Sequence, residues 1–371
     1  MRIRTQLKEI ASFAKGSQIN GDDLIENGEY DYLNGGITPS GKWNAYNTPG
    51  RTVTISEGGN SCGYVNYMRK PFWCGAHCYY LFDTINNTEY LYYMLKSQQD
   101  RLMKLRSGAC MPNIKKADLG SFELEYEADT DKQQHVVSIL ERVEGIITAR
   151  KQQLSALDDL IKARFVEMFG DPVINDRDWK QITLLESLEA GRTVTYGIVQ
   201  TGDEFENGTP VFRPIDIAGG HMPKREELKK TDPLISAQYK RTLLKGNELL
   251  ITVRGSIGET FQTADEFEGC NVGRNIVPLV TDSNKVLQRF LQELFAQDAI
   301  KNWLKGITKG IALQGLNMGE FKEMPVIVPP IAMQRAFVGF ASQIDKSKSV
   351  IRKSLDETQF LFDSLMQKYF G

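Results

Sequence analysis

Long apolar runs and cysteine are both scarce in this 371-residue chain, and each shortage excludes a class of protein. No segment approaches the roughly 18 consecutive apolar residues of a membrane-spanning helix. The N-terminal stretch MRIRTQLKEIASFAKG alternates polar and apolar residues, whereas a secretory signal requires a continuous apolar core. The five cysteines are odd in number and unevenly spread, which argues against a disulfide framework. These features predict a cytoplasmic protein.

An excess of charge of one sign is also lacking. The formal net charge is -2 and the sequence pI is about 6.1, so no global basic surface points to nucleic acid. A DNA-binding protein of this composition would use local basic surfaces or act inside a larger assembly. With 41% hydrophobic and 25% charged residues, the chain is typical of a globular protein with room for two domains.

Motifs of catalysis and metal binding are scarce as well. Cys74, His77 and Cys78 have metal-like spacing in WCGAHC, but a fourth ligand and a second short-spaced pair are missing. The strings PID (214–216) and ELK (227–229) mimic a two-carboxylate-plus-lysine nuclease site, without an equivalent in the first half of the chain. The glycine turns lack the lysine and hydroxyl of a phosphate-binding loop, and no adenosylmethionine loop is visible. We therefore predict no catalytic and no metal site.

An internal repeat organises the sequence. Shifting the chain by 201 residues, the difference between 334 and 133, superimposes similar residues of the two halves. The matched pairs include Gln133 with Gln334, Leu154 with Leu355, Leu160 with Leu361, Phe169-Gly170 with Phe370-Gly371 and, after a small shift, Ile114 with Leu316. The glycine turn at 55–63 resembles that at 251–258, and LKE at 7–9 resembles LLE at 184–186. Each copy is a variable block followed by a shorter, regular block.

The two regular blocks carry a seven-residue apolar repeat and no internal proline. The seam residues of the first are Leu140, Ile147, Leu154, Leu157 and Ile161, and those of the second are Ile344, Ile351, Leu355, Phe362 and Leu365. The spacing predicts helices over 131–170 and 331–371, each roughly 58 Å long at 1.5 Å per residue. A coiled-coil oligomerisation stalk is one interpretation, but the repeat favours an antiparallel pair within the chain.

The variable blocks read as short β-rich runs with glycine turns, each followed by helical pieces. Strands are predicted at 51–56, 77–82, 248–253 and 275–280, and helices at 88–105 and 288–304. The fold class is therefore α+β, with globular domains at 1–130 and 171–330 separated by two long antiparallel helices in a pseudo-two-fold repeat.

Loops of both blocks mix cations, amides and aromatic residues, as duplex-reading surfaces do. Arg and Lys suit guanine edges and phosphates, whereas Asn and Gln suit adenine edges. The candidate DNA-binding residues are Lys42, Asn60, Ser61, Arg69, Lys70, His77, Arg106, Tyr196, Arg213, Arg254, Ser256, Arg274, Asn275, Lys309 and Gln314.

These stretches resemble the specificity subunits of Type I restriction-modification systems. ARKQQLSALDDLIKARFVEMFGDP (149–172) resembles their central spacer, and LKGNELLITVRGSIGE (244–259) resembles their target-recognition domains. The resemblance implies two target-recognition domains, each reading one half of a split asymmetric DNA site. It also implies a non-catalytic subunit that docks two methyltransferase subunits and restriction subunits, with S-adenosylmethionine, ATP and Mg²⁺ used by those partners.

The helix length turns this resemblance into an expectation about the target. We expect roughly five to eight unspecified base pairs between the half-sites, because the spacer corresponds to roughly 17 base pairs. The alternatives are the recognition subunit of a fused methylase-nuclease (Type IIB-like) system and a coiled-coil scaffold that binds protein.

Overall fold

The chain divides into two compact units. The computed structural model describes residues 2–85, 87–108, 112–218, 223–310 and 314–371. Unit 1 comprises Met1–Gln152 with Arg352–Gly371, and unit 2 comprises Gln153–Ile351. Among the described residues, no helix is long and apolar enough to cross a membrane.

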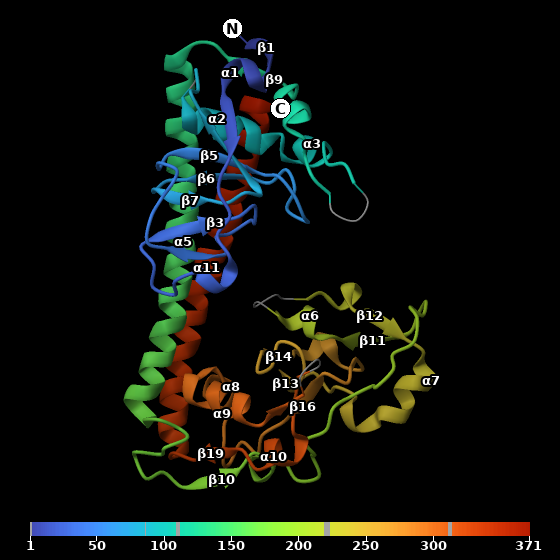
Figure 1. Cartoon of the computed structure of the whole chain (residues 1–371). Helices are drawn as coiled ribbons and strands as arrows, with labels where there is room; N and C mark the ends of the chain where they lie inside the picture. Colours follow the sequence, from blue (N-terminus) through green and yellow to red (C-terminus); the bar gives the residue numbers. More distant parts are fainter. Residues whose placement is uncertain (1, 86, 109–111, 219–222, 311–313) are drawn as a thin grey trace. The chain divides into compact units, whose positions relative to one another are not determined.

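Two 40-residue helices follow the variable blocks, as the heptad pattern predicts. They are α5 (Thr130–Phe169), green in Figure 1, and α11 (Ile331–Phe370), red in Figure 1. Gly170 ends α5 in the left-handed region at φ +74°, where an added Cβ would lie 2.0 Å from an Asp176 oxygen. The boundaries of the units fall inside both helices, so each unit contains the start of one and the end of the other.

Unit 1 combines three small sheets with short helices. A four-stranded antiparallel sheet has the order β2-β8-β5-β6, a three-stranded sheet the order β4-β3-β7 with β3 and β7 parallel, and β1 pairs with β9. The strands are β1 (Arg2–Gln6), β2 (Ser12–Lys15), β3 (Tyr30–Leu33), β4 (Gly41–Trp43), β5 (Thr52–Ser56), β6 (Val65–Met68), β7 (Phe72–Cys74), β8 (Cys78–Phe82) and β9 (Glu123–Glu127). The helices are α1 (Leu7–Ile10), α2 (Thr88–Ser97), α3 (Gln99–Met103) and α4 (Lys116–Gly120).

Unit 2 repeats this plan. Its sheets have the orders β14-β13-β16 and β12-β11-β15, and β10 pairs with β19 and β17 with β18. The strands are β10 (Gln181–Thr183), β11 (Thr209–Phe212), β12 (Lys229–Thr231), β13 (Leu249–Thr252), β14 (Thr260–Gln262), β15 (Asn271–Val272), β16 (Ile276–Leu279), β17 (Thr308–Lys309), β18 (Gly315–Leu316) and β19 (Pro325–Ile327). The helices are α6 (Pro214–Ile217), α7 (Pro233–Ser236), α8 (Gln288–Ala296), α9 (Asp298–Gly306) and α10 (Met318–Lys322).

The predicted strands are confirmed, but the two helices predicted at 88–105 and 288–304 are each broken. The second splits at Gln297, which has an extended conformation (φ -70°, ψ 140°) between α8 and α9. Its buried side chain donates to the Glu293 carbonyl at 3.0 Å, so the break is held from within the core. Gln98 marks the corresponding break between α2 and α3.

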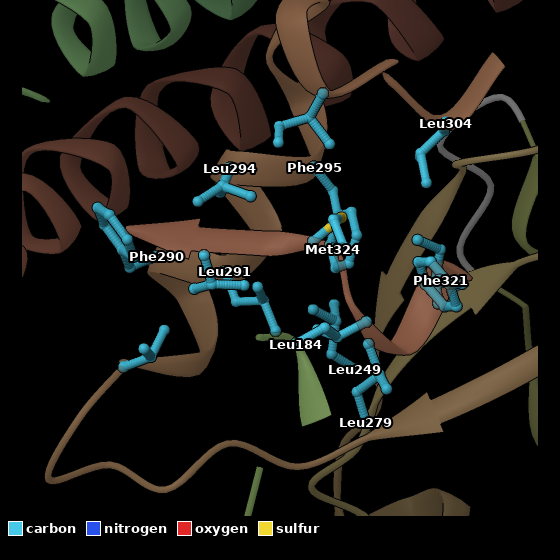
Figure 2. Packing of buried hydrophobic residues seen from close by; sticks show 14 of the residues in the cluster. Leu184, Leu249, Leu279, Phe290, Leu291, Leu294, Phe295, Leu304, Phe321 and Met324 are labelled. Atoms are coloured by element: carbon cyan, nitrogen blue, oxygen red, sulfur yellow. The ribbon is translucent and has the colours of Figure 1, made fainter. Parts of the chain in front are cut away.

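The Phe-Gly ends of the long helices make matching contacts. In unit 2, Phe169 packs on Phe290 of α8 with ring centroids 5.0 Å apart. In unit 1, Phe370 packs on Tyr90 of α2 at 5.2 Å. Leucine and phenylalanine side chains of α8 lie beside Leu249 and Met324 in the unit 2 core (Figure 2).

The two long helices run antiparallel within each unit. In unit 2, Phe165 packs on Phe337, while Asp158, earlier in α5, pairs with Lys348, later in α11. Of the predicted seam residues, Leu140, Ile147 and Ile161 are buried, and Leu154, Leu157, Ile344, Ile351, Leu355, Phe362 and Leu365 are partly buried. Lys348 is a polar member of this seam, 8% exposed, and its ion pair compensates the burial of its charge.

Candidate nucleic-acid interface

One hairpin in each unit presents the candidate loop residues on the same hydrogen-bonded frame. In unit 1 the β5–β6 hairpin closes through Gly63 N–H to Ser56 O at 2.8 Å. In unit 2 the β13–β14 hairpin closes through Gly258 N–H to Thr252 O at 2.9 Å. Both glycines have positive φ, +85° and +89°, which the turn requires. The glycine turns matched in the sequence are therefore equivalent in structure.

A second loop in each unit makes a close backbone contact with the last residue of a strand outside the hairpin, β7 in unit 1 and β15 in unit 2. Ser17 N–H donates to Cys74 O at 2.9 Å in unit 1, and Ile198 N–H donates to Val272 O at 2.8 Å in unit 2. A Cβ at Gly16 or at its counterpart Gly197 would lie 1.8 Å from the same carbonyl oxygens. Only glycine fits there, so these positions fix the distance between the loop and the end of that strand.

The hairpin is also bonded to a third loop, which is the turn that precedes β8 in unit 1 and β16 in unit 2. Glu57 N–H donates to His77 O at 2.9 Å in unit 1, and Val253 N–H donates to Asn275 O at 2.8 Å in unit 2. On the other side, Ile114 N–H donates to Glu57 O at 2.8 Å. In unit 2, Leu316 N–H donates to Val253 O at 3.0 Å, as the match of Ile114 with Leu316 predicts.

In unit 1 this frame brings Lys15, Glu57 and His77 together. The Glu57 carboxylate forms an ion pair with the Lys15 ammonium and lies 3.5 Å from Nδ1 of His77. The side chain of Glu57 is 12% exposed, whereas those of Lys15 and His77 are 43% and 61% exposed. A cavity of about 690 Å³ is lined by these three residues, by Ser61 and by glycines of the neighbouring loops.

In unit 2 the same three positions hold different side chains. The hydrogen bonds above make Tyr196, Val253 and Asn275 the counterparts of Lys15, Glu57 and His77. Tyr196 is 39% exposed and Val253 is buried. A cavity of about 530 Å³ near this hairpin is lined by Gln314 and by Lys301 and Lys305 of α9. At these three positions, the same backbone frame thus carries the ion pair of Lys15 and Glu57 in unit 1 and uncharged side chains in unit 2.

A family model described as Type I restriction modification DNA specificity domain matches residues 4–157 and 177–358. The chain belongs to this family. Each matched segment contains one variable block and most of the long helix that follows it, in agreement with the repeat.

Individual relatives match over shorter stretches. The chain is 25% identical over 209 residues to the Type I restriction enzyme EcoBI specificity subunit of Escherichia coli, covering 55% of this chain and 44% of that protein. It is 29% identical over 209 residues to a putative type I specificity subunit of Mycoplasma genitalium, covering 49% and 54%. The matches thus span about half the length of these curated relatives.

Solved structures show the same fold over the whole chain. The crystal structure of a Type I restriction-modification S subunit from M. genitalium has a TM-score of 0.60 at 21% identity, covering 100% of this chain and 96% of that one. A structure from work on complex assembly and conformational transition of the type I R-M system has a TM-score of 0.52 at 14% identity, covering 100% and 97%. At these identities the likeness establishes the fold of the specificity-domain family.

Most of the candidate residues of this family member lie exposed on the loops and strand ends. Exposed candidates are Lys42, Asn60, Lys70, His77, Arg106, Tyr196, Arg254, Ser256, Arg274 and Gln314, and Asn275 is partly buried. Lys42 lies on β4, apart from the hairpin frame. Ser61 and His77 share the unit 1 cavity. Their contact with DNA remains a prediction.

Besides His77, which faces Glu57, four candidates have side-chain partners inside the protein that the sequence did not predict. Arg69, the residue after β6, forms ion pairs with Glu141 and Glu144 of α5 at 3.3 and 3.1 Å and so ties the end of this strand to the long helix. Arg213 makes two side-chain bonds to Asp216, and Lys309 pairs with Glu320 at 2.8 Å. The Ser61 hydroxyl donates to Gly35 O at 2.6 Å. Contact of these groups with DNA would require the bonds to open or to be shared.

The nuclease-like string does not converge in space. Asp216 bonds to Arg213, whose pKa it raises, whereas Glu227 pairs with Lys224 at 3.8 Å. Lys229 donates instead to Thr201 at 3.2 Å. Among the residues the structure describes, no group of three or more His, Cys, Asp or Glu is arranged to hold a metal ion.

The cysteines of WCGAHC are part of a small core. Cys74 and Cys78 are buried with Leu33 and Phe72. The hydrogen bond with the Cys78 thiol, together with burial, raises the pKa of Cys74, whereas the same bond lowers the pKa of Cys78. Cys110 lies outside the described residues. These contacts do not support the zinc interpretation.

Two fully buried glutamines, Gln133 and Gln334, are the main polar features that the sequence reasoning missed. Each is the fourth residue of its long helix. Gln334 accepts from Leu287 N–H at 2.9 Å and donates to Lys285 O and Pro329 O at 2.9 and 2.8 Å. Gln133 accepts from the Asn87 N–H at 3.0 Å in the same way. The signal was present, because the two glutamines align in the repeat.

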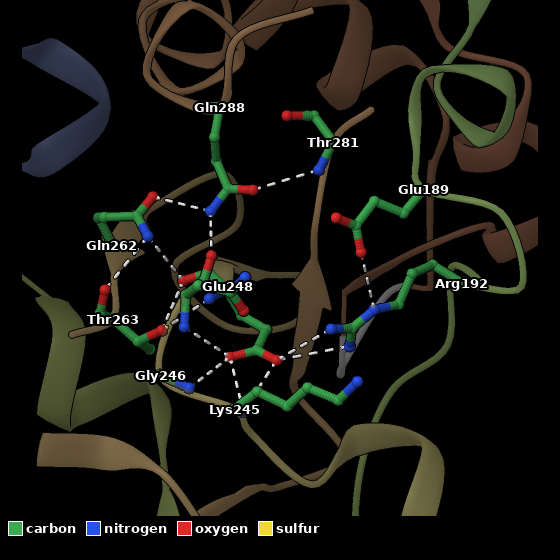
Figure 3. Close-up of polar contacts among 10 residues, drawn as sticks. Glu189, Arg192, Lys245, Gly246, Glu248, Gln262, Thr263, Thr281 and Gln288 are labelled. Carbon is green, nitrogen blue, oxygen red and sulfur yellow. Dashed lines mark hydrogen bonds and ion pairs between the residues drawn. The ribbon is translucent and has the colours of Figure 1, made fainter. Parts of the chain in front are cut away.

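A buried carboxylate explains part of the LKGNELLITVRGSIGE motif. Glu248, fully buried, accepts N–H groups from Lys245, Gly246 and Asn247 at 3.0 to 3.2 Å and lies 3.4 Å from the Arg192 guanidinium (Figure 3). Such a turn satisfies the charge with backbone donors. Glu248 therefore holds the start of β13, which carries the unit 2 hairpin.

Proposed function

We propose that this chain is the specificity subunit of a Type I restriction-modification system and that unit 1 and unit 2 each read one half of a split, asymmetric DNA site. The supporting observation is the shared hairpin frame, which carries Lys15, Glu57 and His77 in one unit and other side chains at the same positions in the other. A common frame with different side chains suits recognition of two different base sequences.

The chemistry of the exposed loops suits double-stranded DNA. Arginine and lysine side chains contact phosphates and guanine edges, and amide side chains contact adenine edges. Exposed residues of these types, such as Lys70, Arg254, Arg274 and Gln314, lie on loops of both units. In this proposal the chain is non-catalytic and cytoplasmic, and it binds no cofactor, because methylation and cleavage belong to partner subunits that use S-adenosylmethionine, ATP and Mg²⁺.

Repeated apolar positions on the long helices support docking of two methyltransferase subunits. Leu160 of α5 and Leu361 of α11 are equivalent in the repeat, and they are 45% and 49% exposed. Phe360, beside Leu361, is 75% exposed. In this proposal, these equivalent exposed apolar residues are docking positions for two copies of the same partner. Restriction subunits would join the complex of the chain with its methyltransferases.

The test is the methylome of a host that produces the chain together with its methyltransferase. We expect one split adenine-methylation motif, which disappears when the gene for this chain is deleted. An unchanged methylome despite an active methyltransferase would contradict the proposal and favour a protein-binding scaffold. If one partner polypeptide carries both methylation and cleavage, the fused methylase-nuclease alternative applies.

Substitution of single loop residues adds a control. Arg254→Ala in unit 2 should change one half of the motif and leave the other half intact, because the side chain lies on the hairpin of one unit only. Changes in both halves would contradict the assignment of one half-site to each unit.

A further inference from the structure

The acidic side chain of Glu57 is an unusual feature of a surface proposed to bind DNA. A carboxylate near phosphates is repelled unless a cation neutralises it or a hydrogen-bond donor of the DNA contacts it. Lys15 and His77 face Glu57 from β2 and from the turn before β8. The carboxylate lines the unit 1 cavity, together with Gly35, Gly36, Gly58 and Gly59. Because glycines have no side chains, a base edge can approach the carboxylate through this cavity.

We propose that Glu57 and Lys15 of unit 1 read a C·G base pair in the major groove, an inference that rests on the proposed function. Their ion pair places a hydrogen-bond acceptor directly beside a donor. A C·G pair presents the complementary arrangement, since the N4 amino group of cytosine lies beside O6 of guanine. Glu57 accepts from cytosine N4, and Lys15 donates to guanine O6 or N7.

The A·T pair fits this arrangement less well. The N6 amino group of adenine is also a donor, but the acceptor N7 lies next to it and repels a carboxylate. On the other base, thymine offers only O4 beside a methyl group, whereas guanine offers two acceptors to an ammonium group. The ion pair therefore discriminates C·G from A·T by repulsion as well as by attraction.

Contacts of Glu57 within the loop fix the direction of its side chain. Its N–H and C=O are bonded to His77 O and Ile114 N, and its carbonyl also accepts from the Cys62 thiol at 3.0 Å. His77 Nδ1 lies 3.5 Å from Oε2, whereas Lys15 bonds to the other carboxylate oxygen, Oε1. Unit 2 has Val253 and Tyr196 at these positions, so we assign C·G readout by this ion pair to unit 1 alone.

The experiment uses the full chain purified with its methyltransferase subunit and a pool of duplexes with randomised base pairs. The bound duplexes are sequenced, and the preference for each base is measured at every position. For the unmodified protein we expect one C·G position at which Glu57→Gln weakens the preference by roughly tenfold, because Glu57 and Lys15 together make the two contacts of a bidentate pair and the substitution removes the charge of one of them. Glu57→Asp keeps a carboxylate and should retain the preference for cytosine over adenine with weaker binding.

Two further variants separate base reading from a supporting role. Lys15→Met removes the contact with guanine and should weaken the preference for the C·G pair without abolishing it, because Glu57 still accepts from cytosine N4. Tyr196→Phe, the matched control at the equivalent position of unit 2, should leave the C·G position unchanged. If Lys15→Met abolished the preference as fully as Glu57→Gln, Glu57 would be only a support for Lys15, and the inference would be overturned.

The outcome also distinguishes this inference from the proposed function. A split site without any position sensitive to Glu57→Gln, or with an A·T pair at the sensitive position, overturns the inference and leaves the proposed function standing. Selection of no split site by the unmodified protein would contradict the proposed function itself.

Discussion

Replacement of Gln334 by leucine is the sharpest test of how the long helices are attached to their units. The side chain is fully buried and makes three hydrogen bonds. It accepts from the N–H of Leu287, the N-cap residue of α8, and donates to Lys285 O and Pro329 O. Leucine has a similar volume and no polar atoms. Gln334→Leu therefore removes the bonds without leaving a large cavity.

The expected loss follows from the groups left unpaired. A buried donor or acceptor without a partner costs about 1 to 3 kcal/mol, and the added apolar contact of leucine offsets part of the loss of three bonds. We expect local stability to fall by about 2 to 4 kcal/mol. Each 1.4 kcal/mol is a factor of ten, so amide exchange should accelerate roughly 30-fold to 1000-fold in α8.

Hydrogen exchange followed by mass spectrometry measures this change segment by segment. Gln334→Leu should affect α8 in unit 2, and Gln133→Leu should affect α2 in unit 1, since each glutamine bonds to the cap of one of these helices. Gln343→Ala, at an exposed position of α11, is the control and should change exchange little. Less than a threefold change in α8, or equal changes in both units, would refute this account of the glutamines.

Three other single contacts can be tested, two of them by substitution and one by titration. Arg69→Glu should lower the free energy of unfolding in urea by about 1 kcal/mol, and Glu141→Arg in the same chain should recover part of it; no recovery would argue against this ion pair. Gly197→Ala places a Cβ 1.8 Å from a carbonyl oxygen, so we expect a loss of about 3 kcal/mol in the same assay, and a neutral result would contradict the close approach. The N–H and hydroxyl of Thr183 hold the pKa of Glu186 below its ordinary value, so this carboxylate stabilises the fold above the unfolded pKa and loses that effect as pH falls through the folded pKa. A carbon-13 NMR titration that gave an ordinary or raised pKa would disprove this.

The long helices and the repeat were predictable because their signals are local or redundant. A seven-residue spacing without proline defines a helix whatever surrounds it, and the predicted range 331–371 corresponds to Ile331–Phe370. Matching residues in two copies, such as Ile114 and Leu316, turned out to occupy equivalent hydrogen-bonding positions. The broken helix at Gln297 was missed because its polar side chain stabilises the break through a bond that only the folded chain provides.

Single side chains of the candidate site were harder to predict. The sequence presents Arg69 and Lys309 as cations on loops, yet each is paired with a carboxylate that is distant in sequence or on another element. The residue type of Glu57 gives no indication of DNA binding, because an acidic side chain is repelled by phosphates. Its significance depends on the approach of Lys15, 42 residues away along the chain.

The side chains that are hard to predict are also those in which the two units differ. Residues that build the frame, such as Gly16 and Gly197, keep their identity in both copies because backbone contacts leave no room for a side chain. Residues that the frame presents, such as Lys15 and Tyr196, have no such constraint and differ. A comparison of the two halves of one sequence therefore distinguishes the frame from the surface that it presents. Residues that are identical in both halves belong to the frame, whereas residues that differ at equivalent, exposed positions belong to the presented surface. By that criterion we expect the positions of Lys15 and His77, and of their counterparts Tyr196 and Asn275, to distinguish the two half-sites.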